Sequence, residues 1–169
     1  MTAGRLVVLA LLAAAALAGG GAWYLQLYAY YERLPEQARF ALTAPGAATP
    51  QDFAIRDFRG IDSDSSPIRY RACFTLAGPV GELAVYPDPT PLIAPGWFDC
   101  FDASAIGAAL AEGRAQAVLS QANIRYGIDR VVALFPDGRG YAWNQINACG
   151  RAHFDGNPVP PGCPPPPAR

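Results

Sequence analysis

The chain has 169 residues and a formal net charge of −1, with 14 acidic residues against 13 basic ones, all of them arginine. This length supports one domain with an additional segment. Because the arginines form no basic stripe and lysine is absent, the sequence predicts neither nucleic-acid binding nor a phosphate-binding loop that ends in Gly-Lys.

The first part of the chain is apolar. No charged residue occurs from Leu6 to Tyr31, and a helix of that length would be about 39 Å long, against a hydrocarbon core of about 30 Å. Aromatic residues crowd its C-terminal end, where an interfacial belt would lie: these are Trp23, Tyr24, Tyr28, Tyr30 and Tyr31. We predict a transmembrane anchor over residues 1–31 that contacts the lipid bilayer through residues 6–31.

The flanking charges predict the orientation of this anchor. Arg5 and the amino terminus precede the apolar segment, and Glu32, Arg33 and Glu36 follow it. The positive-inside rule therefore places the N-terminus in the cytosol and the rest of the chain outside. The alternative is a cleaved signal peptide, with an Ala-Leu-Ala site at 16–18 and three glycines at 19–21 that could unwind the helix. We favour the anchor because apolar and aromatic residues continue past this site, and either alternative exports the domain.

Strand patterns follow a proline-containing stretch. Residues 32–51 combine three prolines with small residues, which is typical of a tether. Alternation of apolar and polar residues then predicts a strand over 68–75. Four further segments have strand patterns, and the last two flank a turn at 136–140: these are 81–86, 115–119, 128–135 and 141–146.

A helix is predicted between the strands expected over 81–86 and 115–119. Asp102 suits an N-cap, and Gly113 stands where a C-terminal glycine belongs. Ile106, Ala109 and Leu110 would share one face of this helix.

Strands with one clear helix among them predict the fold class. We expect a small α+β domain with a mainly antiparallel sheet over residues 52–157. The last segment, 158–169, is rich in proline and predicts an extended tail.

All four cysteines lie in the exported part of the chain: they are Cys73, Cys100, Cys149 and Cys163. An even number in an oxidising compartment predicts two disulfides. Three pairings are possible, and we favour Cys73–Cys100 with Cys149–Cys163 because each closes a short loop. No C-x-x-C motif occurs, and the spacing does not suit zinc, so we predict no metal and no other cofactor.

Catalytic signatures are weak. His153 is the only histidine, and no Gly-x-Ser-x-Gly motif surrounds a serine. The remaining enzymatic option is a carboxylate pair in a cleft, either Asp62 with Asp64 or Asp99 with Asp102. We therefore predict no catalytic residue and expect a protein that is not an enzyme.

Two groups of side chains are candidate binding residues. Trp97 and Trp143 could form an apolar patch for a protein partner. Four charged residues could form ion pairs across the sheet or bind an anionic ligand: these are Arg69, Arg71, Asp129 and Arg130. We expect a partner-binding or accessory protein of the cell envelope. A domain that binds or senses a small ligand is the alternative.

Five stretches carry a resemblance to a known family: DSDSSPIRYRACF (62–74), APGWFDCFD (94–102), YGIDRVVA (126–133), PDGRG (136–140) and GCPPPP (162–167). Together they resemble an uncharacterised family, a domain of unknown function, of short single-anchor alphaproteobacterial envelope proteins. The resemblance implies an inner-membrane anchor with the domain in the periplasm, and it implies no activity. Some members carry a histidine-kinase label, which does not suit a chain with only a few residues before Leu6 on the cytosolic side.

Overall fold

The computed structural model describes residues 2–167 and divides the chain after Tyr31 into two units. The first unit is helix α1 (Ala3–Tyr24), which continues into a π-helical turn (Leu25–Ala29). The three consecutive glycines lie inside α1, so the helix is not interrupted there. By length and composition, this apolar helix could cross a membrane and serve as an anchor.

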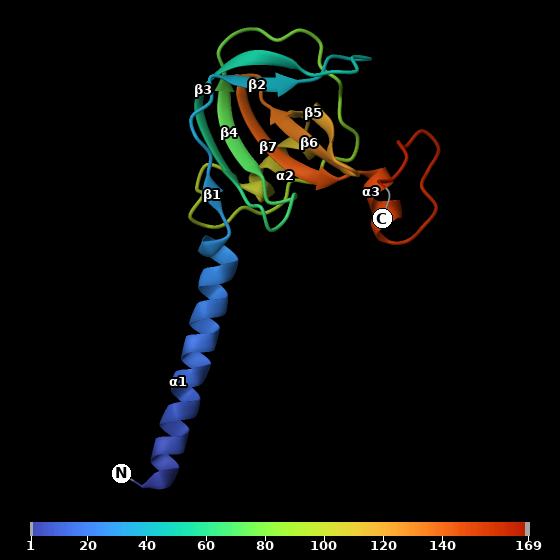
Figure 1. The fold of residues 1–169 in the computed structure, drawn as a ribbon. Helices are drawn as coiled ribbons and strands as arrows, with labels where there is room; N and C mark the ends of the chain where they lie inside the picture. The colour runs from blue at the N-terminus through green and yellow to red at the C-terminus, as the bar shows by residue number, and fades with distance from the viewer. Residues whose placement is uncertain (1, 168–169) are drawn as a thin grey trace. The chain divides into compact units, whose positions relative to one another are not determined.

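The second unit is a domain built on an antiparallel sheet (Figure 1). Its elements are β1 (Glu32–Arg33), β2 (Arg39–Leu42), β3 (Gln51–Asp62), β4 (Arg71–Leu76), α2 (Ala103–Ala111), β5 (Gln116–Arg125), β6 (Ile128–Leu134), β7 (Arg139–Ile146) and α3 (Ala148–Phe154). The strand order is β1-β3-β4-β7-β6-β5, and β2 pairs with β3 outside this path. The predicted α+β class with a mainly antiparallel sheet is confirmed.

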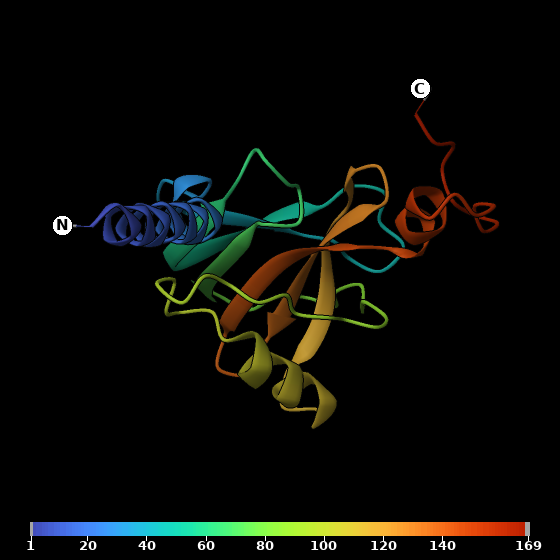
Figure 2. The same ribbon diagram turned by 90° about the horizontal axis from the view of Figure 1, so that it is seen from below.

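The long strand β3 bends and pairs with two short strands in turn. Its first part pairs with β2 and its last two residues pair with β1. A bulge lies between Arg56 and Arg59, where Asp57 adopts a left-handed φ of 56°. Such a bulge increases the local twist, and the sheet therefore curls, as the view from below shows (Figure 2).

The curled sheet nearly closes between β2 and β5. The Thr43 amide donates to the Leu119 carbonyl at 3.0 Å, and the Thr43 hydroxyl donates to the Ser120 carbonyl at 2.7 Å. The Ser120 hydroxyl in turn donates to the Ala41 carbonyl at 2.7 Å. These bonds satisfy part of the free edge of β5, which would otherwise be open to pairing with another chain.

The two faces of the sheet pack against different layers. The inner face holds a cluster of buried apolar side chains: Phe40, Leu42, Ile55, Phe58, Tyr70, Ala72, Phe74, Val118, Val132 and Ala142. The outer face carries the fully buried Trp143, whose indole meets the ring of Phe101 edge to face at 6.4 Å between centroids. Residues 86–102 and α2 cover this outer face (Figure 2), so β4, β6 and β7 are buried on both sides.

The predicted helix is confirmed as α2. The Asp102 carboxylate accepts from the amides of Ser104 and Ala105 at 2.9 and 3.0 Å, which is N-cap geometry. Ile106 and Ala109 are buried, and Gly113 follows the helix with a φ of 69°.

Part of the predicted tether over 32–51 is folded into the domain. Strands β1 and β2 both lie within it, and Phe40 and Leu42 belong to the core. The domain therefore begins at Glu32 rather than at residue 52. The prolines and small residues predict a flexible segment. Strand β2 is only four residues long and pairs with β3, which is not among the predicted strands, so only the tertiary structure shows this pairing.

Two other local predictions need correction. The strand expected over 81–86 is a loop that makes a single bridge, Val85 with Val118. The alternation seen over 68–75 does not separate a core face from a solvent face, because residues 71–74 are all buried. Neither β3 nor α3 is among the elements predicted from the sequence.

The two disulfides form as predicted. Cys73 pairs with Cys100 and Cys149 pairs with Cys163. The first joins β4 to the segment before α2, and the second joins α3 to the C-terminal segment. Disulfides of this kind suggest an oxidising compartment.

Candidate functional site

The predicted tryptophan patch does not exist. Trp143 is 0% exposed and its indole nitrogen donates to the Gln145 side-chain oxygen at 3.0 Å. Trp97 is half-buried on a loop, with the Arg33 guanidinium 5.3 Å from its ring centroid. An aromatic residue that follows a turn cluster can end in the core as readily as on the surface, and the sequence could not distinguish these outcomes.

Arg71 is a buried clamp for backbone carbonyls. It is 4% exposed, and its Nε and Nη2 donate to the carbonyls of Leu92 and Ile93 at 2.7 and 3.1 Å. Its Nη1 donates to the carbonyls of Ile68 and Tyr70 at 2.8 and 2.7 Å. Charge-assisted bonds are stronger than neutral ones, so this arginine fixes the loop that crosses the outer face.

Gln145 completes this attachment, and sequence reasoning missed it. It is 6% exposed. Its Oε1 accepts from the Thr90 amide at 2.8 Å, in addition to the indole of Trp143, and its Nε2 donates to the Asp88 carbonyl at 3.2 Å. The only available signal was two adjacent amide residues, Asn144 and Gln145, within a predicted strand that is otherwise apolar.

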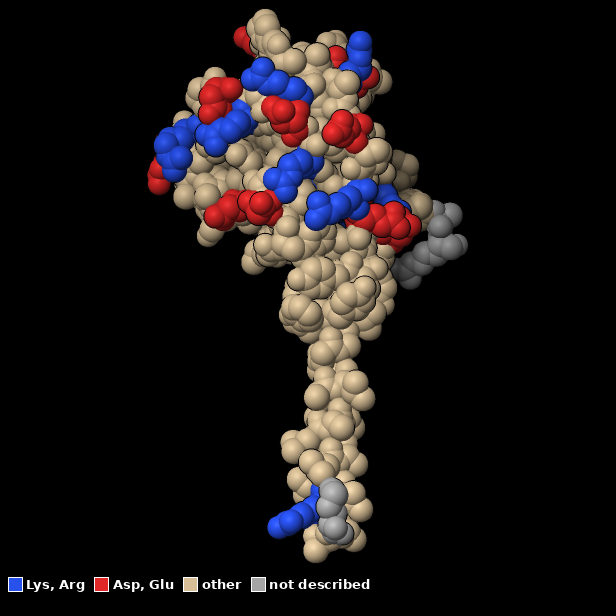
Figure 3. Space-filling model, turned by 90° about the vertical axis from the view of Figure 1, so that its left-hand side faces the viewer, with Lys and Arg blue, Asp and Glu red and all other residues tan. Residues whose placement is uncertain are grey.

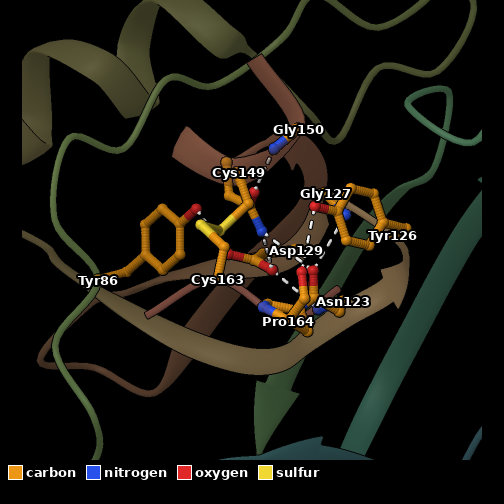
Figure 4. The surroundings of a disulfide bond; sticks show 10 residues. Tyr86, Asn123, Tyr126, Gly127, Asp129, Cys149, Gly150, Cys163 and Pro164 are labelled. Carbon is orange, nitrogen blue, oxygen red and sulfur yellow. Dashed lines mark hydrogen bonds between the residues drawn. A yellow bond between two sulfur atoms is a disulfide. The ribbon is translucent and has the colours of Figure 1, made fainter. Parts of the chain in front are cut away.

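Asp129 holds three segments together near the Cys149–Cys163 disulfide (Figure 4). Its carboxylate is buried and accepts from the Tyr86 hydroxyl at 3.0 Å, the Asn123 amide at 2.8 Å and the Asn147 side chain at 2.8 Å. Burial raises the pKa of Tyr86, and the adjacent Asp129 carboxylate raises it further. The Asp129 carboxylate therefore holds the segments that contain Tyr86, Asn123 and Asn147 in place.

Close backbone contact accompanies this network. Gly127, with a φ of 76°, lies against Gly150 of α3, and a Cβ added to either glycine would collide with the other residue's backbone. The Asn147 amide donates to the Gly127 carbonyl at 2.9 Å. The β5–β6 turn and α3 thus form one packed unit.

Arg130 lies on the opposite face from Asp129, because neighbouring residues of a strand point to opposite faces. Its guanidinium covers the Tyr70 ring at 3.6 Å, and its Nε donates to the Asn144 side chain at 3.0 Å. Burial raises the pKa of Tyr70 to about 12. The predicted cluster of four charged residues is therefore divided between two faces of the sheet.

Asp62 is an acidic residue near enough to Arg130 to feel its charge. Burial raises the pKa of the half-buried Asp62 carboxyl, and the amide of Ser63 and the charge of Arg130 oppose that rise. Asp62 accepts from the Ser63 amide at 2.8 Å. A carboxyl with a raised pKa is a candidate proton acceptor. The hydrogen bond that Asp62 accepts from the Ser63 amide is local and joins neighbouring residues of the chain.

The other residues weighed for catalysis have structural contacts. Asp102 caps α2, and Asp99 pairs with Arg59, which lowers the pKa of Asp99. His153 on α3 meets the ring of Tyr126 at 5.1 Å. Within residues 2–167, no three acidic, histidine or cysteine side chains converge to hold a metal ion.

An open groove of about 1260 Å³ lies at the end of the sheet where β4 and β6 finish. We call it the Val85 groove. Its apolar lining is formed by Leu76, Val80, Leu83, Val85, Leu134 and Phe135. Val85 is 64% exposed. The sequence does not predict that the loops after β4, α2 and β6 line one groove. Residues 81–86 are predicted as a strand rather than as part of a loop.

The charges around the Val85 groove are of both signs. Arg56, Glu82, Arg114 and Asp137 contribute to its lining. Arg114 bonds Glu112 at 2.6 Å and Asp137 bonds Arg139 at 2.7 Å. On the face drawn in Figure 3, arginine and acidic side chains are likewise intermixed over the domain.

Comparison with known proteins gives a family match. The model of a family of unknown function covers residues 40–164. The match begins within β2, inside the stretch that the sequence assigned to a tether. No curated protein and no solved structure matches the chain.

Proposed function

The chain belongs to DUF6446, a family of unknown function, and we propose that it is an envelope protein that binds a protein partner through the Val85 groove. It is exported and anchored in the inner membrane by α1, with the N-terminus in the cytosol and the domain in the periplasm. The apolar helix and the two disulfides support this location, and the flanking charges support the orientation.

The Val85 groove is the observation that carries partner binding. Its lining combines apolar side chains with charged side chains of both signs, and protein interfaces combine the same two kinds of surface. The groove is open to solvent, whereas a small molecule normally lies in an enclosed site, and this favours a segment of a protein chain as the occupant.

A non-enzymatic role is supported by how the buried ionisable groups are used. Arg71 donates to four carbonyls, and Asp129 accepts from three neutral donors. Groups that catalyse proton transfer must reach a substrate atom within hydrogen-bond distance. These two are occupied by their own backbone and neighbouring side chains.

A photocrosslinking residue at position 85 tests the proposal. We expect it to capture one protein in stoichiometric amount from intact membranes of the cells that make the chain. The matched control is the same crosslinker at Gln121, an exposed residue of β5 outside the groove. Equal capture from both positions, or capture from neither, contradicts the proposal.

The alternative is a small-ligand function at Arg130. Its Nε is bonded to Asn144, while its two terminal nitrogens make no hydrogen bond to other described residues. An anion could therefore accept from them, although Asp62 lies near enough to oppose it. Phosphate binding to the full chain that is lost in Arg130→Gln would favour this alternative over the partner.

A further inference from the structure

An apolar loop on the domain carries the most exposed large apolar side chain among residues 2–167. Residues 90–97, Thr-Pro-Leu-Ile-Ala-Pro-Gly-Trp, contain no charge. Ile93 is 84% exposed, whereas the most exposed leucine of α1 reaches 77%. We call residues 91–97 the Ile93 loop. Exposure of an isoleucine to water is unfavourable, and here it occurs within an uncharged stretch.

The Ile93 loop is held in place rather than loose. Arg71 bonds the carbonyls of Leu92 and Ile93, which leaves the Ile93 side chain directed outward. Gln145 fixes the Thr90 amide on one side of the loop. On the other side, Cys100 is joined to β4 by its disulfide. The fold thus uses a buried charge and a covalent bond to present this loop.

The Ile93 loop lies beside the strand through which the chain enters the domain. The Arg33 guanidinium of β1 covers the Trp97 ring at 5.3 Å. Arg33 pairs with Ile61 of β3, and Ile61 pairs with Arg71 of β4. The loop follows this row of the sheet and lies at the same end of the domain as β1 (Figure 1).

The covalent chain then limits how far Arg33 can be from a membrane that α1 spans. Only Glu32 separates Arg33 from Tyr31, the last of the aromatic residues that crowd the end of the apolar segment. Two residues of extended chain reach about 7 Å at most. Trp and Arg are both suited to the boundary between headgroups and acyl chains, the ring by partial burial and the guanidinium by snorkelling.

We infer that the Ile93 loop is a second membrane contact, in which Ile93 and Trp97 enter the interface of the bilayer that holds α1. The occupant is lipid, because the loop is uncharged and apolar and contacts Arg33, which follows the apolar segment by two residues. The inference rests on the proposed anchoring by α1. It adds a lipid contact made by the domain to the one made by the apolar helix.

Quenching by brominated lipid tests this contact in the full chain. A Trp23→Phe variant retains Trp97 and the buried Trp143, and it is reconstituted in vesicles with bromine atoms near the headgroup end of the acyl chains. We expect emission to fall relative to vesicles of unbrominated lipid. Adding Trp97→Phe should abolish that loss, because Trp143 is 0% exposed in the core.

Matched positional variants identify the part of the surface in contact. In the background that lacks Trp23 and Trp97, Ile93→Trp should be quenched. Val85→Trp should not be, because Val85 is also exposed but lines the groove beside Leu76, the last residue of β4, whereas the Ile93 loop is bonded to Arg71, the first residue of that strand. Circular dichroism of each variant confirms that it is folded.

Flotation of the vesicles separates the two hypotheses. Protein that floats while Trp97 and Ile93→Trp are not quenched overturns the loop contact and leaves the anchor intact. Protein that does not float overturns the anchor and the loop contact together. A crosslinker at position 93 that captures a protein in place of quenching would assign the loop to a protein partner and overturn the lipid assignment.

Discussion

Single polar side chains hold the loops of this domain to its sheet. Arg71, Asp129 and Gln145 are buried, and all three bond to backbone groups. Removing one partner would leave buried carbonyls or amides unsatisfied, which costs more than the net gain from making the bond. At this scale the polar residues select one arrangement of the loops, while the apolar core supplies the general driving force.

Asp62 gives a prediction for stability as a function of pH. Burial raises its pKa above the unfolded value of 3.8, so the folded state binds this proton more tightly than the unfolded state. The ionised carboxylate then destabilises the fold above its folded pKa, and this cost disappears as pH falls towards 3.8. Asp62→Asn retains the acceptor for the Ser63 amide and should stabilise the protein at pH 7.

Denaturant unfolding of the full chain in detergent measures this effect. The gain from Asp62→Asn at pH 7 should shrink at pH 3, where the wild-type carboxyl is largely protonated in both states. Asp52→Asn, at an exposed position of β3, is the control and should change little. A gain that is equal at both pH values, or a loss of stability at pH 7, would contradict the assigned cause.

The short helix α3 depends on a disulfide and on capping and packing contacts to stay in place. Helix α3 has only seven residues (Ala148–Phe154), and an isolated helix of that length is not stable in water. It is held by the Asn147 cap on the Gly150 amide, by contact with Gly127 and by the Cys149–Cys163 disulfide. The segment that follows α3 gains its attachment through the same disulfide.

Replacing both Cys149 and Cys163 by serine should lower the free energy of unfolding by about 3 kcal/mol, from the loop entropy of the unfolded chain. The matched variant replaces Cys73 and Cys100, whose separation is 27 residues against 14. It should lose about 3.6 kcal/mol by the same relation. Denaturant unfolding without reductant measures both, and an unchanged midpoint for either variant would show that its disulfide does not limit the unfolded state.

The whole molecule combines one apolar helix with a domain that has two disulfides. Disulfides persist outside the reducing cytosol, which fits export of the second unit. The bends of β3 and the near closure by β2 make the domain a curled sheet that begins at Glu32. The family match over residues 40–164 lies within this unit.

Export and anchoring can be measured together. Alkaline phosphatase fused after Tyr31 should be active, whereas a fusion after Gly4 should be inactive because it lacks the apolar segment. Intact mass of the membrane-bound protein should correspond to the uncleaved chain of 17.9 kDa. An inactive fusion after Tyr31 would refute export, and a mass that lacks the residues up to Ala18 would refute the anchor in favour of a signal peptide.

The sequence by itself determined features that depend on local pattern or on composition. These are the apolar helix, the cap and end of α2, the strands β6 and β7 with their turn, and the even number of cysteines. It also favoured the observed disulfide pairing, because short loops are easier to close.

Only the tertiary structure decided which residues are buried and which segments meet. Trp143, Arg71 and Asp129 suggested a binding surface, yet the loop over the outer face covers them. Residues 32–42 suggested a tether, yet β3 bends to pair with both of their strands. The physical reason is that burial on both faces of a sheet and the lining of the Val85 groove arise from segments far apart in the chain, and no local pattern records their contact.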